Sequence, residues 1–361
     1  MGSPIRLAGF NLGNYERAGA EKGGYRVEVY ANREVETALQ PRMRELLVLP
    51  QPGTTWGRGQ RRPGEVIAVP VEPPRPDPTA RLRAMASDIA AAFEFMAGHF
   101  GPPPLKTLTV SPIPGTFGQG FPGLVYLSTM SYLAPRERPA GARDRFQQLF
   151  YDEILHAHET AHQWWGNTVA SAGYQHDWLM EALANYSALL YLEKKMGAKA
   201  LDAVLDEYRK NLLATDGEGR TLESAGPVVW GARLSSSQFP RAYQAIIYEK
   251  GSWILHMLRR RMGDEAFLKM LGELARRYRF QSVDTEQFRA LAAEFLPRGS
   301  ADPELENFFD HWVYGTGIPA LRVKHSLRGK APALRLTLTL EQDHVDEDFS
   351  ADVPVEIQFR N

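Results

Sequence analysis

The feature that most constrains the fold of this chain is a stretch from Phe146 to Trp165 that contains neither glycine nor proline. Its apolar residues recur at helical intervals, at Phe146, Leu149, Phe150, Ile154, Ala157 and Ala161. This spacing predicts a helix with one face toward the core. The same stretch carries the letters HETAH, from His158 to His162. Because residues four apart share one face of a helix, both histidines can point at a single metal ion.

The histidine pair allows two interpretations, a metal site and a polar face on an ordinary helix. A catalytic zinc ion takes about three protein ligands and keeps one position open for water. Glu159 projects beside the pair, where it can hold that water as a general base. Two histidines on a core-facing helix are costly without partners. The metal site is therefore favoured, and we expect one zinc ion per chain.

The third ligand is expected from the next predicted helix, which begins at about Glu181 and ends at Met196. Glu181, Asn185, Ala188 and Leu192 share one face of that helix, so Glu181 can look back at the first helix. Alternatively, Glu181 could only compensate the helix dipole in a first turn. That alternative does not explain why eighteen residues separate it from His162.

HETAHQWWGN, followed at this interval by WLMEALANY, resembles the gluzincin aminopeptidase family, the group of alanyl aminopeptidase and leukotriene hydrolase. The resemblance implies that His158, His162 and Glu181 bind zinc, that Glu159 is the general base, and that the substrate is a peptide or protein. It extends to AYQAIIYEKGSWILHML, where Tyr248 takes the place of a tyrosine that stabilises the oxyanion. A phenol at a helix start can donate a hydrogen bond to developing negative charge.

The loop before the metal helix departs from the family pattern. Family aminopeptidases carry Gly-x-Met-Glu-Asn there, and its glutamate grips the free amine of the substrate. Here the stretch is GTFGQGFPGLVYL, and alignment of its last Gly-Leu puts Gln119 at the methionine and Gly120 at the glutamate. Both residues, together with Tyr243, are candidates for substrate binding. The glycines leave a backbone edge for an extended peptide, and the missing acid predicts an endopeptidase or a relaxed aminopeptidase.

Two other functions stay open at this point. A catalytically altered relative could serve as a binding scaffold, and an active one could hydrolyse a non-peptide substrate, because a fold does not fix a substrate. The complete ligand set together with Glu159 favours an active enzyme, since a scaffold has no physical need for all four residues.

The rest of the chain predicts an α+β protein. Strands are expected at residues 26–30 and 65–69, then a proline-dense linker at 70–79 and a helix at about 80–101. Further strands, LKTLTVSPIP and GLVYLST, surround the Gly-rich connection TFGQGFPG. More helices are expected at residues 200–214, 248–261, 265–278, 286–295 and 303–313. After Gly317 the pattern changes to period two, which predicts the strands ALRVKHSL, ALRLTLTLEQ and VPVEIQF.

These elements suggest three parts. We expect a thermolysin-like zinc peptidase domain at residues 71–315, mainly helical with a small sheet. It would be flanked by the end of an N-terminal β domain at residues 1–70 and by a partial C-terminal β domain at residues 316–361.

The amino-acid composition argues against some binding partners and excludes chemistry that depends on cysteine. The formal net charge of −1 gives no electrostatic basis for binding nucleic acid. The absence of cysteine excludes disulfides, thiolate ligands and a cysteine nucleophile. No stretch approaches the roughly 18 to 20 apolar residues of a membrane span, and MGSPIRLAGFNLG lacks the basic and apolar regions of a signal peptide.

Overall fold

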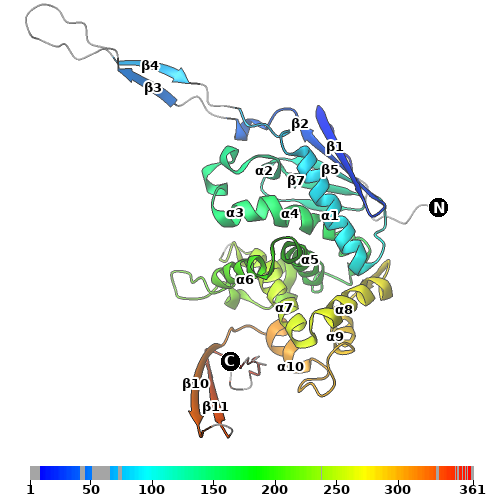
Figure 1. The fold of residues 1–361 in the computed structure, drawn as a ribbon, viewed down its shortest axis with the longest axis vertical. Helices are drawn as coiled ribbons and strands as arrows, with labels where there is room; N and C mark the ends of the chain where they lie inside the picture. Colours follow the sequence, from blue (N-terminus) through cyan, green and yellow to red (C-terminus); the bar gives the residue numbers. More distant parts are fainter. Residues whose placement is uncertain are drawn as a thin grey trace, which may run out of the picture.

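The structure is a computed structural model that describes residues 9–40, 45–50, 66–71, 75–236, 238–330, 333–345, 347, 349–351, 353, 355 and 357–358. Three parts follow one another along its long axis (Figure 1): a sheet with its covering helices, a helical part, and a hairpin near the C-terminus. Among the described residues, no helix is both long and apolar enough to cross a membrane.

The sheet has five strands, which lie in the order β1 (Tyr15–Lys22), β2 (Tyr25–Asn32), β5 (Thr107–Ile113), β7 (Leu124–Ser128) and β6 (Gln119–Phe121). The three central strands are parallel, and the two edge strands run antiparallel to their neighbours. Alternate residues of β2 are buried, as the period-two pattern predicts. β1 and β2 share this sheet with β5, so a boundary at residue 70 falls between strands of one sheet.

Two helical segments cover the sheet. α1 (Leu82–Phe100) packs on β1 and β2 with the apolar face that its sequence predicts, and it ends at Gly101 with φ 81°. α4 (Leu155–Ala161) packs against β6 and β7 and carries most of the HETAH motif. A separate antiparallel pair, β3 (Glu45–Pro50) and β4 (Val66–Val71), lies at one end of the molecule (Figure 1).

The helix predicted over residues 146–165 ends at Ala161 and is not uniformly α-helical. It consists of α3 (Arg145–Leu149), the π-helix η4 (Phe150–Ile154) and α4. A second π-helix, η7 (Gln244–Lys250), leads into α7 (Gly251–Met262). A π-turn holds more residues than an α-turn and rotates the side chains that follow it, which is why such turns are common at functional sites.

Most of the other helices agree with their predicted positions to within a few residues: α5 (Trp178–Met196), α6 (Ala198–Leu212), α8 (Asp264–Arg277), α9 (Thr285–Ala293), and α10 (Glu306–Phe309) with the π-helix η8 (Asp310–Tyr314). The short helix α2 (Thr129–Tyr132) was not predicted. Two short strands, β8 (Val169–Ser171) and β9 (Gln281–Val283), pair in parallel. The strand β6 lies inside the stretch that was expected to be a Gly-rich connection.

The tryptophans after HETAH fix the metal helix in the core. Trp164 and Trp165 are fully buried. The indole N–H of Trp164 donates to the Gly101 carbonyl at 2.9 Å, and that of Trp165 donates to Ser187 Oγ of α5 at 2.9 Å. The end of the metal helix is thereby tied to α1 on one side and to α5 on the other.

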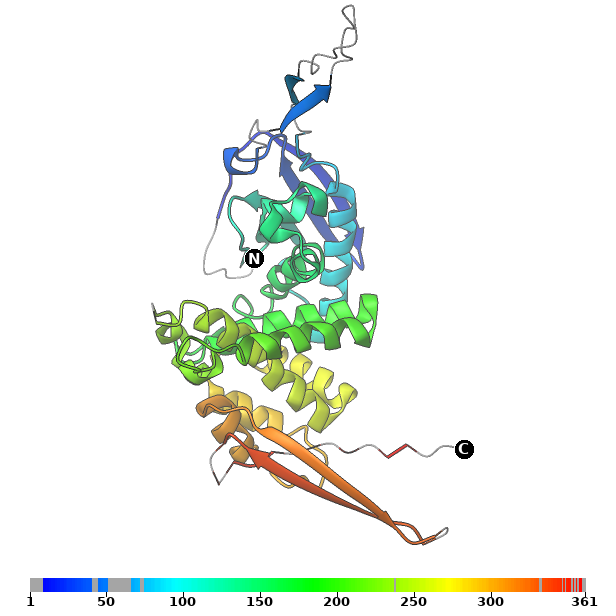
Figure 2. The ribbon, with the colours of Figure 1, turned by 90° about the vertical axis from the view of Figure 1, so that its left-hand side faces the viewer.

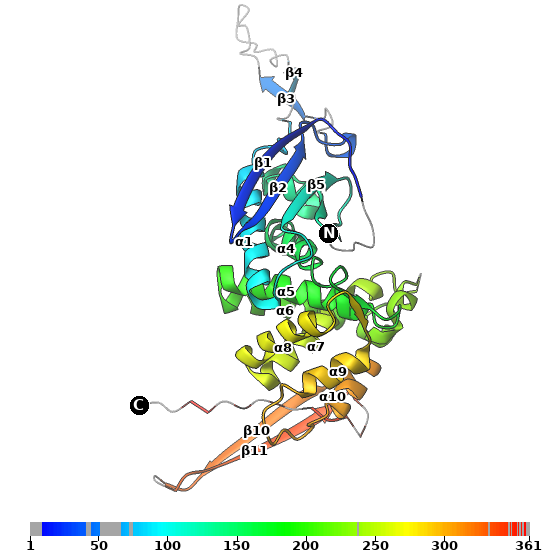
Figure 3. The same cartoon turned by 90° about the vertical axis from the view of Figure 1, so that its right-hand side faces the viewer.

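The C-terminal hairpin consists of β10 (Ala320–Arg328) and β11 (Arg335–Asp343). It lies at the opposite end of the molecule from β3 and β4 (Figures 2 and 3). Its side chains are largely exposed. The third predicted strand, VPVEIQF, falls partly outside the described residues, and the described ones are in no strand.

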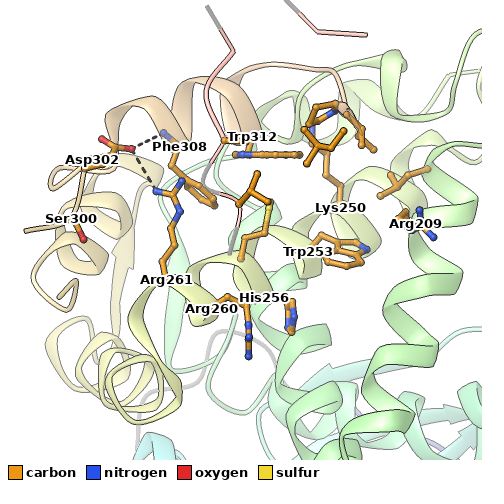
Figure 4. A pocket seen from close by; sticks show the side chains of 18 of the residues that line it. Arg209, Lys250, Trp253, His256, Arg260, Arg261, Ser300, Asp302, Phe308 and Trp312 are labelled. Carbon is orange, nitrogen blue, oxygen red and sulfur yellow. Dashed lines mark hydrogen bonds and ion pairs between the residues drawn. The ribbon is translucent and has the colours of Figure 1, made fainter. Parts of the chain in front are cut away.

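A cavity of about 700 Å³ separates the start of this hairpin from α7 and η8. Figure 4 shows Trp253 and Trp312 on its apolar walls, and Asp302 joined to the Phe308 backbone N–H and to Arg261. Lys250, the last residue of η7, also lines it. The metal-helix residues are absent from its described lining, so this cavity is separate from the histidine pair.

Candidate metal centre

Two packed helices bring the predicted ligands together. α4 carries His158, and His162 follows directly at its C-terminal end. Glu181 lies in the first turn of α5, which packs against α4. α4 therefore lies between the sheet on one side and α5 on the other (Figures 1 and 3).

The three ligand atoms form a nearly regular triangle. The Nε2 atoms of His158 and His162 are 3.1 Å apart. Glu181 Oε2 lies 3.4 Å from the first and 3.5 Å from the second. A tetrahedral zinc ion with bonds of about 2.0–2.1 Å holds neighbouring ligand atoms about 3.3–3.4 Å apart. The triangle thus fits three corners of such a coordination shell.

Contacts behind the ligands orient one of the two histidines. The Nδ1 atom of His162 lies 2.8 Å from the Trp165 carbonyl and donates its proton there, which leaves Nε2 free to bind a metal. The Nδ1 atom of His158 is buried and has no hydrogen-bond partner within the described part of the chain.

Within the triangle of ligand atoms, the Glu181 carboxyl and the histidine rings shift pKa values through their charges. Burial raises the pKa of Glu181, but attraction to His162 and His158 outweighs it and holds that pKa well below the ordinary value. Burial lowers the pKa of His162, but Glu181 opposes it and raises this pKa to about 9. A metal cation at this position would also stabilise the Glu181 carboxylate, as the two histidines do.

Glu159 lies beside the triangle in a buried position. One of its carboxylate oxygens lies within 4.8 Å of a ring nitrogen of each histidine. The residue is 3% exposed, and burial raises its pKa above the ordinary value despite attraction to the two histidines. A carboxylate with a raised pKa is suited to accept a proton near neutral pH and to release it again.

The edge strand β6 lies directly on the metal helix, and two glycines make this approach possible. A Cβ atom at Gly118 would lie 2.5 Å from Glu159 Oε1. A Cβ atom at Gly120 would lie 2.6 Å from both the Glu159 carbonyl and His162 Cβ. Position 120 therefore faces α4 and is buried, whereas Gln119 is exposed. The glycine composition that suggested a loop is explained by this close contact.

The π-helix η7 forms the wall opposite the triangle. The centroid of the Tyr248 ring lies 5.7 Å from that of the His158 ring. The ring of Tyr243 packs edge-on against the Tyr248 ring, with their centroids 6.1 Å apart. Burial and the negative charge of Glu181 raise the pKa of Tyr248, so its hydroxyl stays protonated and can donate.

Asn185 ties this wall to the metal-binding helix. It lies one turn after Glu181, and its amide donates to the Tyr248 carbonyl at 3.4 Å. The same amide nitrogen lies 2.9 Å from Ser252 Oγ and 3.1 Å from the Tyr208 hydroxyl oxygen, so its two protons are shared among three acceptors. Helical spacing predicted that Asn185 lies on the same face as Glu181 but predicted no contact for it. The contact depends on how α6 and η7 pack against α5.

A cleft of about 590 Å³ extends from the triangle between η4, α6 and η7. His158, Glu159 and Tyr248 line it, and so does Glu249, which was not predicted as a site residue. The sequence feature that could have pointed to Glu249 is its position in YEKG, between the predicted oxyanion tyrosine and a lysine.

Other polar residues near the motif point elsewhere. His156 is buried, and its Nε2 lies 3.2 Å from Asp88 Oδ2. His176 accepts a hydrogen bond from the Thr285 backbone N–H at 3.2 Å, and Asp177 accepts one from the Ser171 hydroxyl. None of these contacts involves the three ligands.

Comparison with known proteins gives a family match over the region that holds this site. Residues 140–312 match the peptidase family M1 domain. Over 204 residues the chain is 28% identical to aminopeptidase M1-D of Oryza sativa subsp. japonica, covering 55% of this chain and 21% of the rice protein. Over 218 residues it is 29% identical to aminopeptidase M1 of Arabidopsis thaliana, covering 55% of this chain and 24% of that protein.

Solved structures extend the likeness to most of the fold. An M1 zinc metallopeptidase from Deinococcus radiodurans matches 85% of this chain with 19% identity and a TM-score of 0.51. The match covers 53% of that chain. The chain thus spans about half of this structural relative and about a quarter or less of the two plant proteins. The shared fold combines helices and sheets, which confirms the predicted α+β class.

Proposed function

The chain belongs to the gluzincin aminopeptidase family, and on that premise we propose that it is a zinc-dependent peptidase. His158, His162 and Glu181 would hold one zinc ion per chain. The bound ion would polarise the scissile carbonyl as a Lewis acid and make a water molecule more acidic. The observation that carries this proposal is the triangle of ligand atoms with edges of 3.1, 3.4 and 3.5 Å.

The remaining chemistry belongs to side chains of this chain. Glu159 would accept a proton from the attacking water and transfer it to the leaving nitrogen, a role supported by its buried position beside both histidines. The Tyr248 hydroxyl would donate a hydrogen bond to the carbonyl oxygen as negative charge develops there. Its raised pKa supports this role, because a phenolate could not donate.

We infer a thermolysin-like arrangement for residues 71–315. The support is a metal helix between a small sheet and a helical part, with the edge strand β6 beside the helix. An extended substrate would pair with the backbone of this edge, next to Gln119, by strand addition. Gly118 and Gly120 would serve by keeping the edge close to Glu159 and His162.

The same strand supports a relaxed requirement for a free N-terminus. Position 120 faces α4, and β6 consists of Gln119, Gly120 and Phe121, so it offers no carboxylate to a substrate amine. A charge-assisted hydrogen bond of that kind is worth roughly 1.5–3 kcal/mol. We therefore expect peptides with blocked N-termini to be cleaved at rates comparable to those of free peptides.

A cleavage profile tests the proposal. The zinc-loaded protein is incubated with a mixed peptide library in free and N-acetylated forms, and products are identified by mass spectrometry. Cleavage should disappear with a chelator and return with zinc. Cleavage that persists after complete metal removal would overturn the assignment. A hundredfold or greater preference for free N-termini, the upper range of a charged hydrogen bond, would show that an amine anchor survives.

A further inference from the structure

One buried carboxyl in the cleft has no part in the proposed reaction. Glu249 follows Tyr248 in η7, is 6% exposed and lines the cleft. Its Oε1 accepts a hydrogen bond from Asn211 Nδ2 at 3.2 Å, whereas Oε2 has no hydrogen-bond partner among the described residues. A buried oxygen without a donor costs free energy, and a ligand that supplies the donor would recover it.

The charges around Glu249 favour a cation as that donor. Glu207 and Asp144 line the same cleft, and Arg241 is the one lysine or arginine in its described lining. Arg241 is exposed and, among the described residues, forms no ion pair with Glu249, whereas Glu207 pairs with Lys210 at 3.2 Å. Burial, reinforced by Glu207, raises the pKa of Glu249 to about 8, although Asn211 and Arg241 oppose the shift.

The shape of the cleft suits a long side chain with a charged end. Apolar walls are formed by Phe146, Phe150, Leu155 and Tyr208. Lysine and arginine pack their methylene stems against such walls and carry a charged head at some distance from the backbone. The carboxyl of Glu249 accepts its hydrogen bond from Asn211 of α6, not from α4 or α5, which carry the metal ligands. A long side chain can reach beyond the cleaved bond, whereas an α-amine is held close to its own peptide bond.

We propose that Glu249, with Glu207 beside it, forms a subsite for the basic side chain, lysine or arginine, of a substrate peptide. The ammonium or guanidinium group donates a hydrogen bond to Glu249 Oε2, and its stem packs on the apolar walls. The inference rests on the proposed peptidase function and adds a substrate class to it. The shared chemistry is a cationic nitrogen, which a free α-amine could also provide, so the experiment separates these two sources.

The experiment uses the zinc-loaded protein and N-acetylated, C-amidated peptides that differ only by lysine or norleucine at each position around the cleaved bond. At one position the parent should favour lysine by about tenfold or more in kcat/KM, the range of a hydrogen bond to a charged group. Glu249→Gln should retain zinc and lose this preference, and Glu207→Gln should weaken it. Glu265→Gln, on the exposed face of α8 beside Lys269, is the matched control and should preserve it.

The pH dependence gives an independent signature. A carboxyl with a pKa raised to about 8 is protonated below that pH, so the preference for lysine should increase from about pH 6 to pH 9 as the carboxylate forms. The other titratable or charged groups that line the same cleft are Asp144, Tyr151, His158, Glu159, Glu207, Tyr208, Arg241 and Tyr248. Because Glu249→Gln leaves those groups in place, its preference should not change with pH.

Three outcomes would overturn the subsite. The first is zinc-dependent cleavage with no lysine preference, and the second is a preference that Glu249→Gln retains. The third is a Glu249→Gln variant that loses only its preference for free over acetylated norleucine peptides, which would assign the carboxyl to the α-amine. Binding of the same peptides to zinc-loaded Glu159→Gln, with and without Glu249→Gln, measures the preference without turnover. A parent that binds lysine peptides selectively but cleaves none would contradict the peptidase function alone.

Discussion

The metal corner (His158, His162 and Glu181) and the η7 wall (Tyr248 and Glu249) belong to one cleft. They differ in whether their polar atoms have partners within the protein. In the metal corner, the Nε2 atoms of His158 and His162 and a Glu181 oxygen face one another within 3.5 Å. On the η7 wall, Glu249 Oε2 faces no donor among the described residues. The corner holds three ligand atoms placed for one cation, whereas the free oxygen on the wall is placed for a donor on the substrate. Substitutions in the two regions should therefore separate metal binding from substrate chemistry.

The largest effect is expected from removing a ligand in the metal corner. His158→Ala, His162→Ala and Glu181→Ala should each lower zinc affinity by more than about a hundredfold, because a site with three ligands has no redundancy. Activity should be lost with the metal. Zinc content after dialysis, measured by elemental analysis, checks this, and full occupancy in all three variants would remove the site assignment.

Glu159→Gln should separate zinc binding from catalysis in the metal corner. The amide keeps the size of the side chain but cannot accept the proton, so kcat should fall by roughly 10²–10⁴-fold or more. Zinc content and melting temperature should match the parent. Turnover within a factor of ten of the parent would mean that another group is the base.

Lys250→Met tests whether the buried ion pair between Lys250 and Glu223 stabilises the η7 wall. The Lys250 ammonium lies 2.6 Å from the Glu223 carboxylate, both side chains are almost fully buried, and Glu223 also accepts the Gly317 N–H. Breaking a buried pair by removing one partner costs about 3–5 kcal/mol, because the other charge stays buried.

Thermal unfolding of the zinc-loaded variants measures this loss. The double variant Lys250→Met, Glu223→Gln should recover most of it, since no unpaired charge remains. If the single variant melts within about a degree of the parent, the pair does not stabilise the wall.

Tyr248→Phe should reduce chemistry without disturbing the metal. Loss of one oxyanion donor lowers kcat by about 10²–10³-fold, or about 2.7–4 kcal/mol. Steady-state kinetics and zinc content, taken together, check this expectation. A phenylalanine variant that turns over like the parent would limit the tyrosine to packing against His158.

Gly120→Ala should give the smallest effect, and it tests the strand that lies against the metal corner. The new Cβ would meet the Glu159 carbonyl and His162 Cβ at 2.6 Å, and overpacking of this kind costs about 1–3 kcal/mol. Gly98→Ala in α1 is the matched control, because nothing lies within 4 Å of its Cβ position. The control should stabilise the protein by about 0.5–1 kcal/mol, and equal melting temperatures for both variants would contradict the close contact.

The sequence by itself determined the metal corner in outline. The spacing of His158 and His162 has a fixed consequence on a helix, since residues four apart share a face whatever surrounds them. Glu181 was predicted in the same way, from its face on the following helix. The apolar periodicity also predicted α1 and the helical part of the fold to within a few residues, because burial of one face imposes that period.

Only the tertiary structure decided the substrate side of the cleft. TFGQGFPG reads as a loop, yet it contains β6, because the need for Gly118 and Gly120 arises from the nearby atoms of Glu159 and His162. The place of Glu249 in YEKG did not predict its role either, since its burial and its unpaired oxygen depend on how α6 packs against the π-helix η7. Local spacing specifies what lies on one helix face, whereas close approach and burial depend on elements that are distant in the chain.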